Sequence, residues 1–151
     1  MLINVYKNNY ILLKKKLVNP LNTSDPTFKL INEVKRNDYV SAQNSINMYK
    51  NIINNIDSRG WTALHWACYF GYESIVKLLI NNEAKLDIKT LKGFVDGKIE
   101  FNDIYAKKTA KEIAEMRHHK TCVKMITNCR FKRGFMKTVD VGKTIITAIP
   151  K

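Results

Sequence analysis

Two short clusters in this sequence of 151 residues contain residue types that bind nucleotides or metals in other proteins. Residues 142–144, Gly-Lys-Thr, match the end of a phosphate-binding loop, but Lys137 occupies the position of the required upstream glycine. His118, His119 and Cys122 are of metal-ligating types, but adjacent histidines point in different directions on a helix and no second ligand pair follows. No nucleophile, base and orienting residue occur together. The sequence therefore predicts no catalytic residue, no metal, no cofactor and no enzyme.

A third cluster, near the C-terminus, interleaves basic side chains with aromatic rings. Its members are Arg130, Phe131, Lys132, Arg133, Phe135 and Lys137. Cations in such a segment can follow phosphates while the rings stack on bases, so the cluster is a candidate RNA-binding site. A solvated charged terminus is the alternative interpretation.

The overall charge is strongly positive, with 26 Lys and Arg residues against 13 acidic residues and a net charge of +13. Residues 1–24 carry +4, residues 25–128 carry +4 and residues 129–151 carry +5, so the two short ends hold most of the excess. Such a balance informs about partners and solubility and not about fold. Acidic protein surfaces, RNA and anionic lipid are all compatible with it.

The cysteine content indicates a reducing compartment. Cys68, Cys122 and Cys129 are an odd and scattered set, which argues against a disulfide scaffold. No apolar run reaches the length of a membrane span. The N-terminal arm, residues 1–24, lacks acidic residues and is weakly amphipathic, which fits either a mitochondrial targeting segment or a helix that caps the fold. We therefore expect an intracellular protein, cytoplasmic or, if the arm is a targeting signal, mitochondrial.

The stretch 57–89 has the clearest pattern of local structure. Residues 57–60, Asp-Ser-Arg-Gly, are typical of a turn. Thr62 is a good N-cap for a short helix, and Gly71 supplies the positive φ that would end it. A second helix follows, with Ile75, Val76, Leu79 and Ile80 on one face. The pattern predicts a turn, a helix, a second turn, a second helix and a loop.

The same stretch resembles an ankyrin repeat. Residues 62–67, Thr-Ala-Leu-His-Trp-Ala, match the Thr-Pro-Leu-His-x-Ala signature except for Ala63. The resemblance implies that His65 hydrogen-bonds backbone between neighbouring repeats. Glu83 departs from the family, which prefers glycine after the second helix, and we expect Asn82 to take the left-handed conformation instead.

Two further repeats can be aligned with the central one. Subtracting 33 places Leu64 on Ile31 and Leu79 on Ile46, in a degenerate first repeat with a possible slip of one residue at the turn. Asp25 and Pro26 would open its first helix. Adding 47 places Thr62 on Thr109, so an insertion of about 14 residues precedes the third repeat. Residues 94–99, Phe-Val-Asp-Gly-Lys-Ile, predict that this insertion is a lengthened β-hairpin finger.

The expected fold is an all-α ankyrin-repeat solenoid of about three repeats, with one lengthened β-hairpin finger and basic terminal arms. We expect a basic N-terminal arm at 1–24, the ankyrin-repeat domain at 25–128 and a basic C-terminal arm at 129–151. The repeats would span about 25–56, 57–90 and 91–128, with the insertion near 91–105. A single repeat cannot bury its own apolar face, so the repeats must stack.

In the ankyrin family, the turn tip and the end of the first helix of each repeat form a variable concave surface. The resemblance therefore implies a protein-binding face made of Arg36, Arg59, Trp61, Tyr69, Phe70, Met116 and Arg117. Trp, Tyr and Arg are the types that dominate binding hot spots. Coverage of Tyr69 and Phe70 by the arms or the finger is the alternative.

These observations favour a non-catalytic ankyrin-repeat protein–protein interaction module or scaffold. The alternative is a structural subunit of a ribonucleoprotein assembly, such as an organellar ribosome, whose basic arms contact RNA. The sequence does not name the partner.

Overall fold

The computed structural model describes residues 25–91, 94–95, 98–99 and 104–139, and in these parts the chain forms three stacked helical hairpins. The helices are α2 (Pro26–Lys35), α3 (Tyr39–Met48), α4 (Ala63–Phe70), α5 (Glu73–Asn81), α6 (Ala110–Met116) and α7 (Lys120–Val139), with a 3₁₀ turn, η1, at Lys50–Ile52. The N-terminal arm expected at 1–24 and the part of the C-terminal arm at 140–151 lie outside the described residues.

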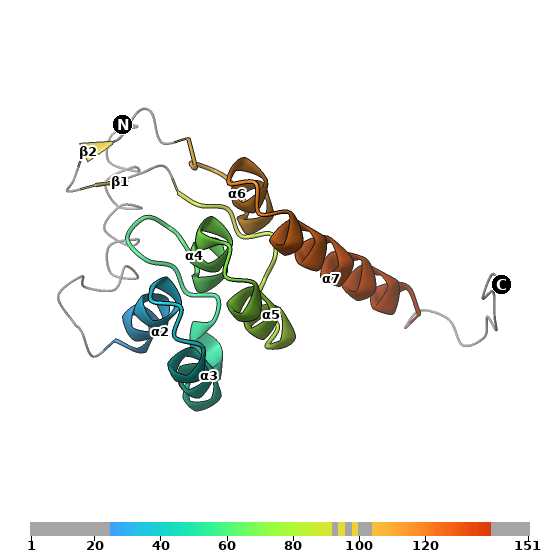
Figure 1. The fold of residues 1–151 in the computed structure, drawn as a ribbon, viewed down its shortest axis with the longest axis horizontal. Coiled ribbons are helices and arrows are strands. Elements are labelled where there is room, and N and C mark those ends of the chain that lie inside the picture. Colours follow the sequence, from blue (N-terminus) through green and yellow to red (C-terminus); the bar gives the residue numbers. More distant parts are fainter. Residues whose placement is uncertain (1–24, 92–93, 96–97, 100–103, 140–151) are drawn as a thin grey trace, which may run out of the picture.

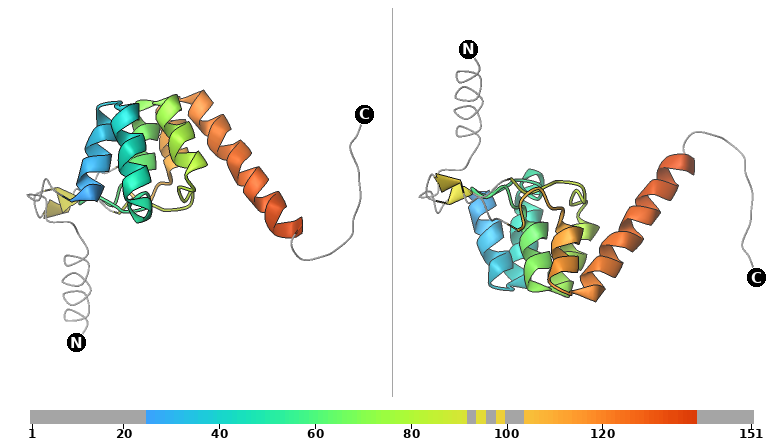
Figure 2. Two further views of the ribbon diagram at one scale, coloured as in Figure 1. Left: turned by 90° about the horizontal axis from the view of Figure 1, so that it is seen from below. Right: turned by 90° about the horizontal axis from the view of Figure 1, so that it is seen from above.

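The helices form two rows (Figures 1 and 2). Helices α2, α4 and α6 form the inner row, in which α4 packs between the other two. Helices α3, α5 and α7 form the outer row, with α5 in the middle. This arrangement confirms the predicted all-α solenoid of about three ankyrin repeats.

The inner helices begin at the predicted N-caps. The Asp25 carboxylate accepts from the Thr27 amide at 2.6 Å and Pro26 follows it in the first turn. The Thr62 and Thr109 hydroxyls each accept the backbone amide three residues on, and the side chains of His65 and Glu112 bond back to the two cap amides. Each cap satisfies amides that a helix start leaves without partners.

The inner helices also end in one shared way. Asn37, Gly71 and His118 all adopt positive φ, at 58°, 74° and 61°. In each repeat the next amide bonds the carbonyl five residues back, which is the Schellman motif. A β-carbon on Gly71 would lie 2.6 Å from the His119 ring, so glycine is needed there for space as well as for φ.

These turns fix the alignment of the repeats. Gly71 corresponds to His118 at the expected offset of 47, but to Asn37 at an offset of 34. The first repeat is therefore displaced by one residue from the subtraction of 33, and Leu64 corresponds to Leu30 instead of Ile31. The slip arises because the Schellman bond of the first repeat joins the Asp38 amide to the Glu33 carbonyl.

The core lies between the two rows and continues from one repeat to the next. Both helices of the central repeat contribute fully buried side chains to it, and neighbouring repeats add Ala42, Ile46, Ala114 and Ile126. The members from the central repeat are Ala63, Leu64, Ala67, Cys68, Ile75, Val76, Leu78, Leu79 and Ala84. The apolar face that was predicted for residues 75–80 is thus buried against two other repeats.

The insertion before the third repeat is fastened at its base by Thr90, which is buried. The Thr90 amide donates to the Lys108 carbonyl, and the Thr90 carbonyl accepts from the Lys107 amide. The Thr90 hydroxyl donates to the Tyr105 carbonyl and accepts from the Lys108 amide. Within the insertion, β1 (Phe94–Val95) pairs antiparallel with β2 (Lys98–Ile99). Residues 92–93, 96–97 and 100–103 lie outside the described residues, so the lengthened finger stays a prediction.

Two expectations differ from the structure. Asn82 has φ −98°, and Glu83 takes the left-handed conformation with φ 64°, because the Ala84 amide reaches back to Leu79 and the Schellman turn falls one residue later. The C-terminal arm was expected to begin at residue 129, but α7 continues through that position to Val139.

The left-handed Glu83 gives a prediction for stability. Replacing Glu83 by Gly removes the steric cost of a β-carbon at positive φ, and we expect the free energy of unfolding to rise by about 0.5–1 kcal/mol. Urea denaturation measures the change. Glu83→Ala is the matched control, since it removes the same charge but keeps the β-carbon. A gain of equal size for both variants would contradict the conformational explanation.

Candidate functional site

The candidate site is the surface formed by the C-terminal halves of the three inner helices, which we call the inner face. It is formed by Asn32, Lys35 and Arg36 of α2, Trp66, Tyr69 and Phe70 of α4, and Met116 and Arg117 of α6. Two contacts join the three helices across it. Lys35 Nζ of α2 lies 3.9 Å from the centroid of the Trp66 ring, and the Arg117 guanidinium of α6 lies 4.5 Å from that of Tyr69.

Aromatic rings form the centre of the inner face. Trp66 and Phe70 stack at 6.0 Å between centroids, and Phe70 stacks on Tyr72 at 5.3 Å. Tyr69 meets Phe70 edge-on at 5.0 Å. The Trp66 indole N–H donates to the Asp57 carboxylate at 2.8 Å, which fixes this ring to the turn before α4. The centre is therefore a rigid aromatic shelf.

Trp61 was expected on the protein-binding face, but the structure buries it with 3% of its surface exposed. Trp66 lies 4.5 Å away on one side and Tyr105 lies 5.6 Å away, centroid to centroid. Tyr105 also meets Tyr69 at 5.4 Å. Since Tyr105 belongs to the end of the insertion, this end of the insertion covers part of the expected face, and Trp61 supports the shelf from beneath.

The other expected residues of the face are accessible. Phe70 and Met116 are each 38% exposed, and Arg36, Arg59 and Arg117 are exposed as well. Arg117 also donates from Nε to the Tyr69 carbonyl at 3.4 Å, beside His119, whose Nε2 lies 3.1 Å from that oxygen. The structure thus brings Arg36, Tyr69, Phe70, Met116 and Arg117 to one surface.

Four members of the site were missed from the sequence, and they are Asn32, Lys35, Trp66 and Tyr105. An offset of 34 places Lys35 on Tyr69, whereas the offset of 33 drew attention to Arg36 alone. Burial lowers the pKa of Lys35, Asp57 raises it and Arg59 lowers it further. Tyr105 had no local signal, because its contacts with the shelf arise only after the insertion folds back.

The candidate RNA-binding residues all lie on α7, and they do not share one environment. Arg130, Phe131 and Lys132 are exposed, with Phe131 at 76%. Arg133 instead turns back to the central repeat and donates to the carbonyls of Ala84 at 2.8 Å and Ile80 at 2.9 Å. The side chains of Phe135 and Lys137 lie outside the described residues. One central member of the predicted RNA site therefore bonds the C-terminal end of α5.

The titratable groups of the core are structural. His65 Nδ1 accepts from the Thr62 amide at 3.0 Å, which leaves Nε2 to donate to the Ile88 carbonyl at 3.0 Å. The bond is to backbone, as expected, but Ile88 lies in the loop that ends the same repeat and not in a neighbouring one. Burial raises the pKa of the Cys68 and Cys122 thiols, so both stay protonated at neutral pH.

Among the described residues, no group of three His, Cys, Asp or Glu side chains could hold a metal ion. In the same part of the chain, no helix is long and apolar enough to cross a membrane.

The chain consists of stacked helical hairpins, and in each hairpin a residue with left-handed conformation connects the two helices. This architecture defines a class of helical repeat proteins. The chain belongs to the ankyrin-repeat family, since the family model described as "Ankyrin repeats (3 copies)" matches residues 14–90 and 34–136. Ankyrin repeats indicate a protein–protein interaction module, and members of the family are generally non-enzymatic.

Two individual proteins are similar to it. The acyl-CoA-binding domain-containing protein 6 homolog of Dictyostelium discoideum is 51% identical over 49 residues. Those residues are 32% of this chain, and they span 17% of the length of that relative. The crystal structure of an ankyrin repeat domain from Acinetobacter baumannii is similar with a TM-score of 0.53 and 23% identity, over 66% of this chain and 46% of that one. This second likeness shows the fold alone.

The buried imidazole predicts how stability depends on pH. Burial lowers the pKa of His65 to about 4, below about 6.5 for an unfolded chain. The unfolded state therefore binds the extra proton, and stability is lost as the pH falls from about 6.5 to about 4. We expect the free energy of unfolding to drop by about 2 kcal/mol between pH 7 and pH 5. Urea titrations at both pH values measure it, and an equal drop in His65→Gln would assign the effect elsewhere.

The bonds of Arg133 predict a loss of stability when they are removed. Arg133→Ala removes the side-chain donor of the Ala84 carbonyl and one of the donors of the Ile80 carbonyl, which keeps the Glu83 amide, and we expect about 1–3 kcal/mol less stability in thermal or urea denaturation. Arg130→Ala is the control on the same helix, because that side chain is exposed, and its effect should stay within about 0.5 kcal/mol. If Arg133 served RNA and not the fold, its removal would leave the melting curve unchanged.

Proposed function

We propose that this protein is a non-catalytic scaffold that binds a protein partner on its inner face. The observation that carries the proposal is the aromatic shelf with accessible Phe70 and Met116 at its edge and cations at both ends. Rigid rings that lose little entropy on binding, next to arginines, are the composition of interface hot spots. The surface corresponds to the concave, variable surface that the resemblance to ankyrin repeats implies.

The geometry suits recognition better than it suits chemistry. Lys35 and Arg117 hold two rings of the shelf from either side, so the surface is ordered before a partner arrives. Preorganisation of this kind reduces the entropy lost on association. The buried imidazole and thiols described above are occupied in the core and take no part in the surface.

The ribonucleoprotein alternative has less support. Arg133 bonds the protein's own backbone, and three of the six candidate residues are left exposed within the described part of α7. The family match likewise points to a protein partner. We therefore do not carry an RNA-binding subunit forward as the proposed function.

Site-specific photo-crosslinking tests the proposal. A benzophenone amino acid in place of Phe70 should form a discrete protein adduct in extract of the source cells, and the adduct should survive nuclease treatment. The same amino acid in place of Lys77, which is exposed on α5 in the outer row, is the control. Adducts that form equally from both positions, only from position 77, or only without nuclease would contradict a protein-binding inner face.

A further inference from the structure

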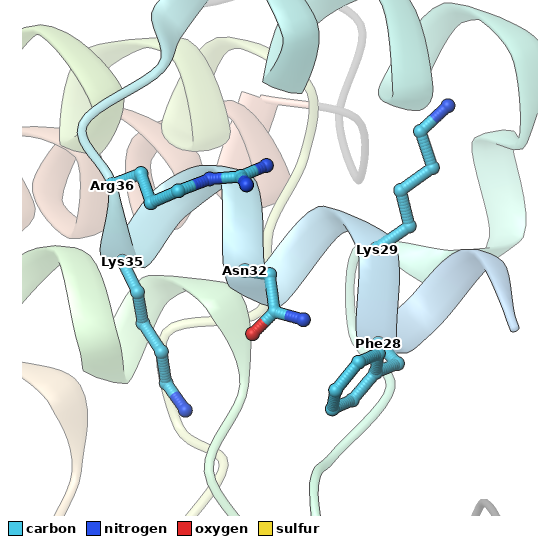
Figure 3. A pocket seen from close by; sticks show the side chains of 5 residues that line it. All are labelled: Phe28, Lys29, Asn32, Lys35 and Arg36. Atoms are coloured by element: carbon cyan, nitrogen blue, oxygen red, sulfur yellow. The ribbon is translucent and has the colours of Figure 1, made fainter. Parts of the chain in front are cut away.

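The first-repeat end of the inner face contains an open pocket of about 410 Å³ on α2. Phe28, Lys29, Asn32, Lys35 and Arg36 line it. Figure 3 shows Phe28, Asn32 and Lys35 following one another along one side of the helix, while the Arg36 and Lys29 side chains extend on the other side in this view. This spacing of four and three residues places the three side chains on one helical face. The pocket therefore presents one aromatic ring, one amide and cationic groups together.

The positive charges of this pocket have acidic neighbours, but only Lys29 is within ion-pair distance of one. Asp57 acts on Lys35 and Asp38 interacts with Arg36 at longer range. Lys29 Nζ lies 4.0 Å from a carboxylate oxygen of the buried Glu33, so an ion pair within α2 partly compensates the charge of Lys29. Lys35 and Arg36 form no ion pair in the described part of the chain. Lys111, by contrast, pairs with Glu115 at 3.3 Å on α6. An anion that enters the pocket would therefore meet two cations that have no carboxylate in direct contact.

Lys35 is the better placed of the two. Its ammonium group sits over the Trp66 ring and is half-buried, and burial lowers the pKa of Lys35, while the charge of Asp57 raises it and that of Arg59 lowers it. A cation in that position has lost part of its hydration, and Asp57 offsets only part of this loss because it forms no ion pair with Lys35. A carboxylate brought by a partner would offset this loss, and a charge-assisted bond of this kind is about twice as strong as a neutral one.

The chemistry favours an acidic peptide over a nucleic acid. Single-stranded nucleic acids bind through bases that stack on open aromatic faces. On this surface Lys35 and Phe70 already lie against Trp66, and Arg117 lies over Tyr69. A carboxylate binds cations and does not require an open aromatic face. Apolar side chains next to the carboxylate in the partner segment would pack on the exposed parts of Phe70 and Met116.

We propose that this pocket is a carboxylate-binding site, which takes an Asp or Glu side chain of an acidic partner segment lying across the inner face. Lys35 and Arg36 supply the charge, and the Asn32 amide donates beside them. The net charge of +13 attracts such a segment from solution. This inference rests on the proposed function, because it names the partner chemistry of the same face.

Fluorescence anisotropy with the full chain tests the site. The probe is a short fluorescein-labelled peptide of Glu and Leu residues, and its counterpart has Gln in place of Glu. We expect the protein to bind the Glu peptide and not the Gln peptide. The double variant Lys35→Gln with Arg36→Gln should lower the affinity for the Glu peptide at least about tenfold, which is about 1.4 kcal/mol. Lys77→Gln with Lys124→Gln is the matched control, since it removes the same charge from exposed positions of α5 and α7 and should leave the affinity within about twofold.

Arg36→Glu is a second variant. It should leave the aromatic shelf intact, because the Arg36 side chain is exposed. It should weaken the Glu peptide more than Arg36→Gln does. Equal losses for the pocket variant and the outer-row control would show unspecific attraction and overturn the site. Failure of the Glu peptide to bind, or tighter binding of a single-stranded RNA oligonucleotide through the same two residues, would also overturn it. If the crosslink from position 70 persists in either case, the protein-binding face stands and only the carboxylate site falls.

Discussion

The hydrogen bonds of His65 connect the parts of the structure that form the binding face. One ring nitrogen accepts the amide that begins α4, and the other donates to Ile88 in the chain that leads to the third repeat. Two residues later Thr90 fastens the base of the insertion, and the insertion brings Tyr105 over Trp61 and Tyr69. A neutral, buried imidazole thus sets where the insertion returns and what part of the aromatic shelf it covers.

The second constraint is the shared left-handed turn at the end of each inner helix. Because the same Schellman bonds close α2, α4 and α6, the last turns of the three helices reach one surface. Side chains two residues before each turn then line up across the stack, as Lys35, Tyr69 and Met116 do. The composition of these positions, cationic, aromatic and apolar in turn, is the basis of the proposal that the face binds a partner with carboxylates and apolar groups.

Local signals in the sequence predicted much of this, and long-range contacts account for most of the rest. Thr62, Gly71 and His65 act within their own repeat or on the adjoining loop, so the central repeat and the turn at His118 could be predicted. The burial of Trp61 depends on Tyr105, and the bonds of Arg133 reach carbonyls 49 and 53 residues away, which no local pattern encodes. The offset of the first repeat was missed by one because Asn37, and not the following Asp38, takes the left-handed turn.

The central claim is that the three inner helices act as one binding surface. Nuclear magnetic resonance spectra of the ¹⁵N-labelled full chain, titrated with the acidic Glu and Leu peptide, test it most directly. The account predicts shifts of amide signals from all three inner helices, at Asn32, Tyr69 and Met116, while Lys77 and Lys124 in the outer row keep their positions. Shifts confined to α7, or spread over every lysine-bearing element alike, would contradict it.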